Sequence, residues 1–164
     1  MTRLLLACAL LLAAAAQADD ALKPFQRGSA QAIVEARAGR PFILAFWSVE
    51  CVHCRAELEH LAALSRMHPQ LDVVLVSTDA VSASREVSGV LRQYELPRAE
   101  RWVFADDFTE RLRFEVDPRW HGELPRTYLY GPGKVVAGMS GKLDSERIRP
   151  WLQSVLEAAR HGRD

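Results

Sequence analysis

Residues 42–57 read FILAFWSVECVHCRAE, and this stretch decides the fold. Its first six residues, Phe42–Trp47, form an uninterrupted apolar run of strand length, which is typical of a strand covered on both faces. After a short loop, the apolar residues recur at helical spacing from Cys51 to about Met67. The stretch therefore predicts a buried strand, a short loop and an amphipathic helix, with a pair of cysteines where the helix begins.

Strand-like and helix-like segments alternate on both sides of this stretch. A helix is expected from Ser29 to a stop near Gly39, and Pro150 predicts a distorted first turn or a delayed start for a C-terminal helix. The remaining expected elements are a strand at 72–77, a helix at 82–94, a strand at 102–105, a helix at 107–114 and a hairpin of strands at 126–130 and 135–139. This order predicts a three-layer α/β domain whose mixed β-sheet is flanked by helices.

The first 18 residues, MTRLLLACALLLAAAAQA, have the features of a secretory signal peptide. The apolar run Leu4–Ala16 is 13 residues long, whereas a helix that spans a bilayer needs about 20. Small residues flank Gln17, so we expect cleavage before Asp19, with an uncleaved anchor as the alternative. The sequence thus predicts a signal peptide at 1–18, a single domain at 19–164 and a periplasmic location.

The composition of the chain argues against nucleic acid and membrane surfaces as partners. Lys and Arg together number 21, as do Asp and Glu, so the formal net charge is zero. A chain with no basic excess is a poor candidate for binding nucleic acid or a membrane surface. After loss of the signal peptide two cysteines remain, Cys51 and Cys54. In an oxidising compartment such a close pair is either a structural disulfide or a redox couple. We expect the protein to be a monomer.

The position of the cysteine pair favours redox chemistry. Cys51 is expected at the N-terminus of a helix, where unpaired N–H groups and the helix dipole stabilise a thiolate. A thiolate is the nucleophile in thiol–disulfide exchange, and Cys54 is close enough to resolve a mixed disulfide. His53, when protonated, would stabilise the Cys51 thiolate further, whereas the carboxylate of Glu50 would oppose it.

The pattern F-W-S-x-x-C-x-x-C-R-x-E, placed between an apolar strand and an amphipathic helix, resembles the exported thioredoxin-like proteins of the TlpA type. These are thiol–disulfide oxidoreductases, several of which serve cytochrome c maturation or copper-site assembly. The resemblance covers nearly the whole mature chain and implies a thioredoxin-like fold. Pro125 lies 71 positions after Cys54, which leaves room for one extra strand–helix unit between the CxxC helix and the cis-Pro strand.

The resemblance also implies roles for particular residues. Pro125 would be the cis-proline that faces the dithiol, and the backbone of Leu124 would pair with the substrate chain. Trp47 is included among the candidate substrate-binding residues, although its position favours packing beneath the loop over a direct substrate contact. Glu57 matches the acidic residue of the family pattern. Because it lies three residues after Cys54, it shares a helix face with that thiol and could carry its proton.

Three departures from the thioredoxin pattern stand out. Glu50 replaces the aromatic residue that usually precedes the first cysteine, and the loop between the cysteines contains no proline. The buried aspartate of cytosolic thioredoxins is replaced by Ala45. We therefore expect Glu57 to take the place of that aspartate as proton carrier.

The expected partners are protein thiols and disulfides, together with a membrane thiol–disulfide electron donor. No cofactor is expected beyond the redox-active Cys51–Cys54 disulfide. We expect a reductant or an isomerase-like exchanger, because strong oxidants with a Cys-x-His-Cys loop carry a large helical insertion for which this chain has no room. Two alternatives are a dithiol oxidant and a copper chaperone in which Cys51, Cys54 and His53 hold Cu(I).

Overall fold

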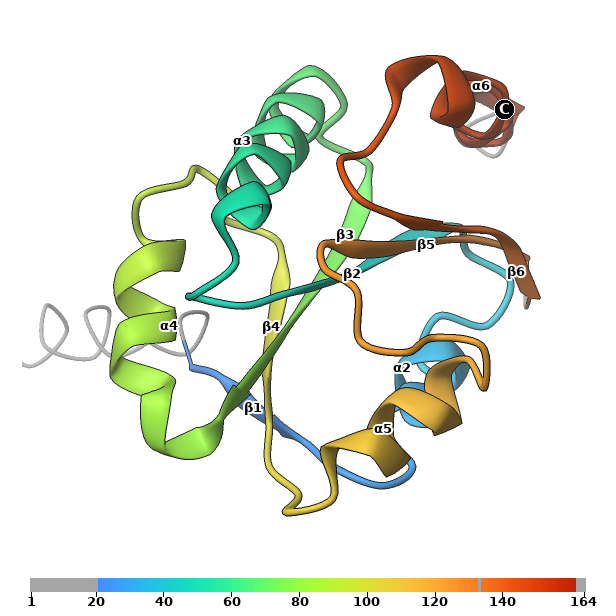
Figure 1. The fold of residues 1–164 in the computed structure, drawn as a ribbon. Coiled ribbons are helices and arrows are strands. Elements are labelled where there is room, and N and C mark those ends of the chain that lie inside the picture. The colour runs from blue at the N-terminus through green and yellow to red at the C-terminus, as the bar shows by residue number, and fades with distance from the viewer. Residues whose placement is uncertain (1–20, 133, 162–164) are drawn as a thin grey trace, which may run out of the picture.

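The computed structural model describes residues 21–132 and 134–161. It is built around a six-stranded sheet with the strand order β1-β4-β3-β2-β5-β6 (Figure 1). The strands are β1 (Lys23–Phe25), β2 (Phe42–Trp47), β3 (Asp72–Ala80), β4 (Glu100–Phe104), β5 (Arg126–Gly131) and β6 (Lys134–Ser140). The first four in spatial order run parallel, whereas β5 is antiparallel to both β2 and β6. The sheet is therefore mixed, as the sequence predicts.

Helices cover both faces of the sheet and complete the three layers (Figure 1). They are α2 (Ser29–Glu35), α3 (Val52–Met67), α4 (Ser84–Leu91), α5 (Thr109–Val116) and α6 (Ser145–His161), with a 3₁₀ turn, η2, at Val81–Ala83. Side chains of α3, α4 and α6 pack in one buried cluster, and side chains of α2 and α5 pack in a second. The two clusters lie on opposite faces of the sheet.

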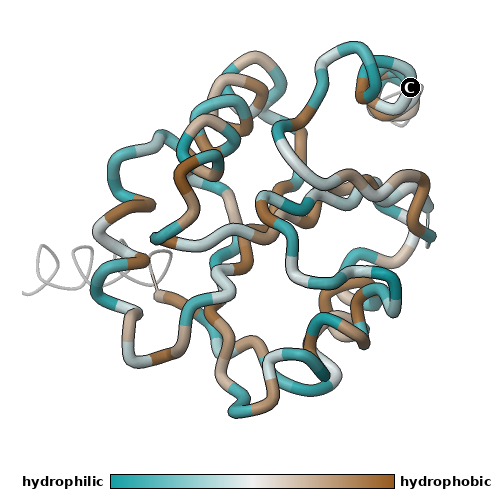
Figure 2. The backbone as a smooth tube through the Cα atoms, in the orientation of Figure 1, coloured by the Kyte–Doolittle hydropathy of each residue, from teal (hydrophilic) through white to brown (hydrophobic). Residues whose placement is uncertain are grey.

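The central strand β2 contributes to both clusters. All six of its residues are buried. Ile43, Ala45 and Trp47 face the cluster of α3, while Phe42, Leu44 and Phe46 face that of α2. A strand with two buried faces needs no polar alternation, which explains its continuous apolar sequence. The helices instead alternate hydrophobic and hydrophilic residues, as the colouring of α3 and α4 shows (Figure 2).

The structure differs from the expected elements in four places. The three-residue edge strand β1 is too short to have been recognised, and β3 continues beyond Ser77 to Ala80. The helix expected at 82–94 is divided into η2 and the shorter α4. The C-terminal helix starts at Ser145, directly after Asp144, and holds Pro150 within it, so the delayed start does not occur. The extra unit between α3 and β5 consists of β4 and α5, as expected.

The predicted signal peptide, residues 1–18, lies outside the described residues. Within residues 21–132 and 134–161, every helix is too short or too polar to cross a bilayer.

Candidate active site

The two cysteines form a disulfide at the start of α3, with their Cα atoms 5.3 Å apart. Cys51 is the N-cap residue of the helix, and its carbonyl accepts a 3.1 Å hydrogen bond from the N–H of Cys54. Cys54 has no exposed surface, whereas Cys51 is partly exposed and Val52 beside it is 83 % exposed. The disulfide therefore presents one sulfur to a partner and keeps the other inside the protein.

The loop that leads to Cys51 is held in place by the end of β3. Asp79 accepts a 2.8 Å hydrogen bond from Ser48 Oγ through Oδ1 and a 2.9 Å bond from the Val49 N–H through Oδ2. Ser77 Oγ also donates to Oδ2. These bonds join the two residues after β2 to the adjacent parallel strand. Asp79 is thus the residue that positions the loop, and the sequence analysis did not identify it.

The sequence does contain a signal for Asp79. The polar triplet Ser77-Thr78-Asp79 directly follows the apolar run of β3. The carboxyl ends of neighbouring parallel strands meet at the same sheet edge, where ligands and functional loops gather. A polar group at the end of β3 is consequently a candidate partner for the loop after β2.

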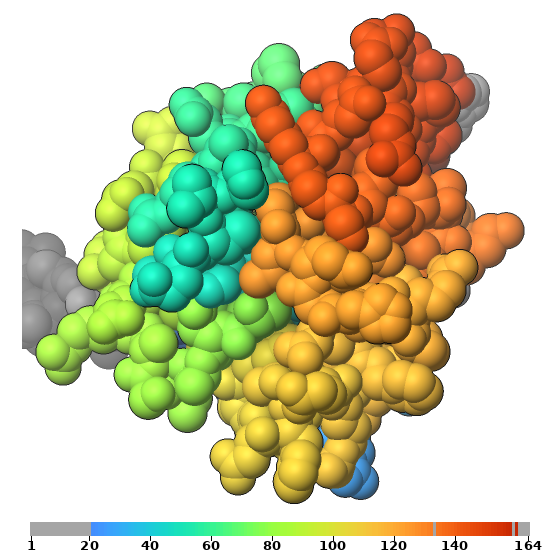
Figure 3. Space-filling model, viewed as in Figure 1, coloured from blue at the N-terminus to red at the C-terminus, as the bar shows by residue number. Residues whose placement is uncertain are grey.

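The segment before β5 lies beside the start of α3. The Leu124–Pro125 peptide bond is cis, as the resemblance implies. In the space-filling view, the chain near the CxxC is next to the segment that precedes β5 (Figure 3). Pro125 is buried and its carbonyl accepts a 2.8 Å bond from the Gly141 N–H. Leu124 is partly exposed, and within the described residues its backbone N–H and carbonyl have no hydrogen-bond partner.

Glu57 is buried on α3, one helical turn after Cys54, with only 1 % of its surface exposed. Thr127 Oγ1 donates a 3.0 Å hydrogen bond to Oε1, and the Leu143 N–H donates a 2.7 Å bond to Oε2. Burial raises the pKa of the Glu57 carboxyl, although these two bonds and the charges of His60 and Lys142 act in the opposite direction. The carboxyl thus connects the CxxC helix to the cis-Pro strand and to the segment before α6.

A second buried acid, Asp117, lies on the other face of β5. Its carboxylate accepts a 2.9 Å bond from Arg126 Nη2, a 3.0 Å bond from the Arg119 N–H and a 3.4 Å bond from the Tyr128 hydroxyl. The backbone N–H of Arg119, the side chain of Arg119 and the charge of Arg126 hold its pKa below the ordinary value. Burial raises the pKa of Tyr128 to about 12. This acid is a fixed negative charge in an ion-paired network.

The remaining predicted site residues are Trp47, His53 and Glu50. Trp47 is 1 % exposed and packs in the core cluster under the loop, so its side chain offers no surface to a substrate. His53 and Glu50 are exposed on either side of Cys51. A further aromatic residue near the cis-proline, Trp120, was not among these predictions; it is buried, and its Nε1–H donates a 3.0 Å bond to the Glu123 carbonyl.

Across the described residues, no three or more His, Cys, Asp or Glu side chains gather in a way that could hold a metal ion. For Cu(I), the chain thus offers the two thiols of the CxxC, with the exposed His53 between them.

A helix-capping CxxC disulfide, a mixed sheet with flanking helices and a cis-proline before the antiparallel strand together define a thioredoxin-like fold. No family model matches the sequence, and no curated protein matches it significantly.

Solved structures share the fold. A thiol-disulfide isomerase from Corynebacterium glutamicum aligns with a TM-score of 0.55 at 18 % identity, covering 74 % of this chain and 84 % of that one. A thio-disulfide isomerase from Thermus thermophilus aligns with a TM-score of 0.54 at 23 % identity, covering 73 % of this chain and 82 % of that one. A secreted disulfide oxidoreductase from Mycobacterium tuberculosis aligns with a TM-score of 0.51 at 19 % identity, covering 70 % of this chain and 81 % of that one. At these identities the likeness establishes a thioredoxin-like fold, and the chemistry has to be argued from this chain's own residues.

Proposed function

We propose that the protein is a thiol–disulfide oxidoreductase that exchanges its Cys51/Cys54 dithiol with partner proteins, acting in the periplasm as a reductant. The observation that carries this proposal is the asymmetry of the disulfide, in which Cys51 is accessible at a helix N-terminus and Cys54 is fully buried. A structural disulfide has no need of such an arrangement. A redox pair needs one sulfur that partners can reach and one that only its neighbour can reach.

The reaction begins with the reduced dithiol. The Cys51 thiolate attacks a partner disulfide, forms a mixed disulfide and releases one partner sulfur as a thiolate. Cys54 then loses its proton and attacks Cys51 Sγ, which forms the Cys51–Cys54 disulfide and releases the second partner sulfur. The partner disulfide gains two electrons, and the protein dithiol loses them. An external dithiol restores the reduced form, which is the role we assign to a membrane electron donor.

Glu57 is the base for the resolving step. Ionisation of Cys54 in a buried site is costly unless a nearby group accepts the proton. The Glu57 carboxyl shares a helix face with Cys54 and has a raised pKa because it is buried, and a raised pKa makes its carboxylate a stronger base. Its hydrogen bonds to Thr127 and Leu143 keep it in position between the elements that form the site.

The backbone of Leu124 provides the docking position for the substrate chain. Its N–H and carbonyl have no partner among the described residues, and they lie at the edge of the cis-Pro turn, in the segment beside the start of α3 (Figure 3). An extended partner segment can pair with these groups, which satisfies them and aligns its disulfide with Cys51.

The finer assignments rest on the sequence. The C-x-x-C-R-x-E pattern supports the TlpA type within the thioredoxin-like proteins, with cytochrome c maturation or a similar process as the setting. The signal-peptide pattern of residues 1–18 supports export, and a secreted protein is among the structural matches. Only one extra strand–helix unit, β4 and α5, lies between α3 and β5, which supports a reductant because the large helical insertion of strong oxidants is absent there.

The accessible thiol is identified by limited alkylation. Reduced protein treated with less than one equivalent of iodoacetamide should be labelled at Cys51, and a Cys54→Ser variant should trap mixed disulfides with its partners. A Cys51→Ser variant is the matched control and should trap few. Preferential labelling of Cys54 would contradict the assignment.

The direction of electron flow follows from the reduction potential, measured in glutathione redox buffers. We expect a value near the −270 mV that is typical of thioredoxin, whereas a value near −120 mV would make the protein an oxidant. In the same buffers, a copper chaperone would show tight Cu(I) binding but no catalysed reduction of an insulin disulfide.

A further inference from the structure

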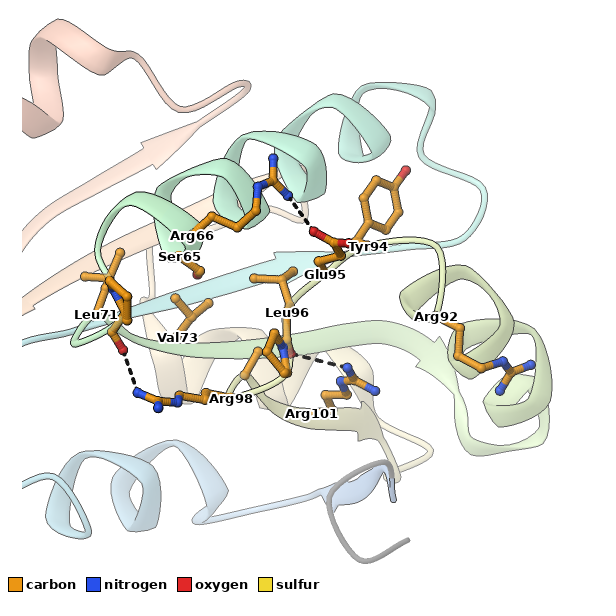
Figure 4. Close-up of a pocket in the computed structure, with 13 residues that line it drawn as sticks. Ser65, Arg66, Leu71, Val73, Arg92, Tyr94, Glu95, Leu96, Arg98 and Arg101 are labelled. Carbon is orange, nitrogen blue, oxygen red and sulfur yellow. Dashed lines mark hydrogen bonds and ion pairs between the residues drawn. The ribbon is translucent and has the colours of Figure 1, made fainter. Parts of the chain in front are cut away.

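A groove of about 820 Å³ lies at the end of α3 that is opposite the dithiol (Figure 4). Three of the arginines that line it are engaged within the protein. Arg66 is paired with Glu95, and Arg98 and Arg101 donate hydrogen bonds to backbone carbonyls. These interactions tie the walls of the groove to one another, which is a structural role.

Nearer the dithiol, the Glu57 carboxyl on α3 meets the Thr127 hydroxyl on β5. Glu57 is 1 % exposed and Thr127 is fully buried. Thr127 Oγ1 donates a 3.0 Å hydrogen bond to Oε1 of the carboxyl, and the Leu143 N–H donates a 2.7 Å bond to Oε2. Each carboxyl oxygen therefore has a donor of its own.

The neighbours of Thr127 in the sheet do not compete for its hydroxyl. Thr127 lies opposite Ala45 of β2 and Met139 of β6. Ala45 has no polar side-chain group, and the thioether of Met139 is a weak acceptor. The Glu57 carboxyl is thus the hydrogen-bond partner of the Thr127 side chain within the described residues.

The two donors to Glu57 differ in what they can do. An N–H group only donates, whereas a hydroxyl has one hydrogen and two lone pairs and can also accept. When Glu57 takes up a proton, the Leu143 N–H still needs an acceptor, and this favours Oε2 as the carbonyl oxygen of the acid. The proton then lies on Oε1, where the Thr127 hydroxyl can turn and accept it.

The same hydroxyl acts on the balance between the two forms of Glu57. Burial raises the pKa of the carboxyl, whereas the Leu143 N–H, the Thr127 hydroxyl and the charges of His60 on α3 and Lys142 before α6 lower it. A hydrogen bond to a carboxylate is stronger than one to a neutral carboxyl, so the Thr127 bond favours the ionised form. Replacing Thr127 removes this bond without changing any charge.

We propose that Thr127 is the positioning residue of the proton carrier and that Oε1 of Glu57 is the atom that receives the Cys54 proton. This proposal rests on the proposed role of Glu57 as the base. In the resolving step Cys54 loses its proton to Oε1, its sulfur bonds to Cys51 Sγ, and the partner sulfur leaves with the electron pair of the mixed disulfide. The Thr127 hydroxyl turns from donor to acceptor as the carboxyl is protonated, and turns back when the carboxyl ionises again.

The first test is a titration of Glu57 in the oxidised protein, in which the two cysteines do not titrate. NMR of ¹³C-labelled glutamate follows the carboxyl, and Glu57→Gln assigns its signal. Thr127→Val should move the midpoint to higher pH by about 0.5–1 pH unit, because the lost bond favours the carboxylate. Thr127→Ser keeps the hydroxyl and should restore the original midpoint. Thr109→Val, which removes a hydroxyl on α5 that does not contact Glu57, is the matched control.

The second test is the pH profile of mixed-disulfide resolution. Because the carboxylate form is the base, Thr127→Val should slow resolution about three- to tenfold on the acid side of the profile, in step with its titration. The difference should shrink at higher pH, where Glu57 is ionised in both proteins. Thr127→Ser should follow the unaltered protein, and Thr127→Ala makes the same comparison if Thr127→Val does not fold.

The outcomes separate this proposal from the one on which it rests. An unchanged or lowered midpoint in Thr127→Val would overturn the role of Thr127, as would an equal shift in Thr127→Ser or in the Thr109→Val control. If Glu57→Gln slows resolution in that case, the base assignment still stands. If Glu57→Gln does not slow resolution, the base assignment is overturned, and with it the transfer of the Cys54 proton to Oε1.

Discussion

A buried acid lies against each face of β5, and the two acids differ in their hydrogen-bond partners. Thr127 points to the face of α3 and donates to Glu57, which has no arginine bound to it. Arg126 and Tyr128 point to the opposite face and bind Asp117. Accordingly the pKa of Glu57 is raised, mainly by burial, and the pKa of Asp117 is lowered, mainly by its hydrogen bonds.

This difference separates a group that can exchange a proton from one that cannot. A carboxylate beside a bound arginine stays ionised over the physiological range, so it stabilises the fold but does not transfer protons. Burial of a carboxyl whose hydrogen-bond donors are neutral raises its pKa and favours its protonated form. In the proposed mechanism, one acid serves the chemistry of the dithiol, and the other maintains the cis-Pro strand on which that chemistry depends.

The largest expected effect is on the rate at which a Cys51 mixed disulfide is resolved. Glu57→Gln should slow this step at least tenfold near pH 7, because general-base assistance is typically worth about 10²–10⁴-fold. The glutamine can keep both hydrogen bonds, since its oxygen accepts from Leu143 and its amide donates to the Thr127 hydroxyl. The loss should shrink at high pH, where Cys54 ionises unaided. Stopped-flow measurement across this range gives the profile, and identical profiles for both proteins would contradict the role of Glu57.

Asp117→Asn should reduce the stability of the fold and leave the resolution rate nearly unchanged. It should lower the free energy of unfolding by about 2 kcal/mol, because hydrogen bonds to a charged group are typically worth 1.5–3 kcal/mol. The resolution rate should stay within twofold. Since the pKa of folded Asp117 is below its unfolded value of about 3.8, its contribution is present above that pH and is lost as pH falls through the folded pKa. Urea denaturation at pH 7 and pH 3 measures the loss of stability and its dependence on pH. Arg119→Gln, at a side chain that is 90 % exposed, is the mild control.

The stability of Glu57→Gln should depend on pH in the other direction. Because the pKa of Glu57 is raised in the folded protein, protonation stabilises the fold below pH 4.5 and this contribution is lost as pH rises through the folded pKa. Relative to the unaltered protein, the Glu57→Gln variant should therefore gain stability between pH 4.5 and pH 7.5. Denaturation of the oxidised proteins at both pH values tests this, and a constant difference between them would show that Glu57 does not change its protonation state.

The smallest expected effect concerns His53. If a protonated His53 stabilises the Cys51 thiolate, His53→Val should make the couple more reducing by about 10–20 mV. Interactions of exposed charges with a helix terminus are worth about 0.3–1 kcal/mol, and 30 mV corresponds to about 1.4 kcal/mol. Equilibration with glutathione measures the shift, with Arg85→Gln as the control. An unchanged potential would leave His53 as an exposed loop residue with no tuning role.

The elements of the fold that are long and regular were accessible from the sequence. The apolar run of β2 was recognised with its observed bounds, and the start of α3 was placed within one residue, because both depend on local patterns of hydrophobicity. The edge strand β1 was missed because three residues carry no period. The extension of β3 was missed because polar residues end a hydrophobic pattern even where the backbone still pairs.

For the site, the sequence contributed the residue types and their order. The spacing of Cys51, Cys54 and Glu57 on one helix was visible because local periodicity determines which residues share a face. The cis-proline at 125 was implied by the resemblance to the TlpA-type proteins. Which distant groups complete the site was decided by the tertiary structure alone. Asp79 meets the CxxC loop, Leu143 meets Glu57 and Arg126 meets Asp117 only because the sheet brings separate strands together. Long-range contacts of this kind leave no period in the chain, so they become apparent only in the folded protein.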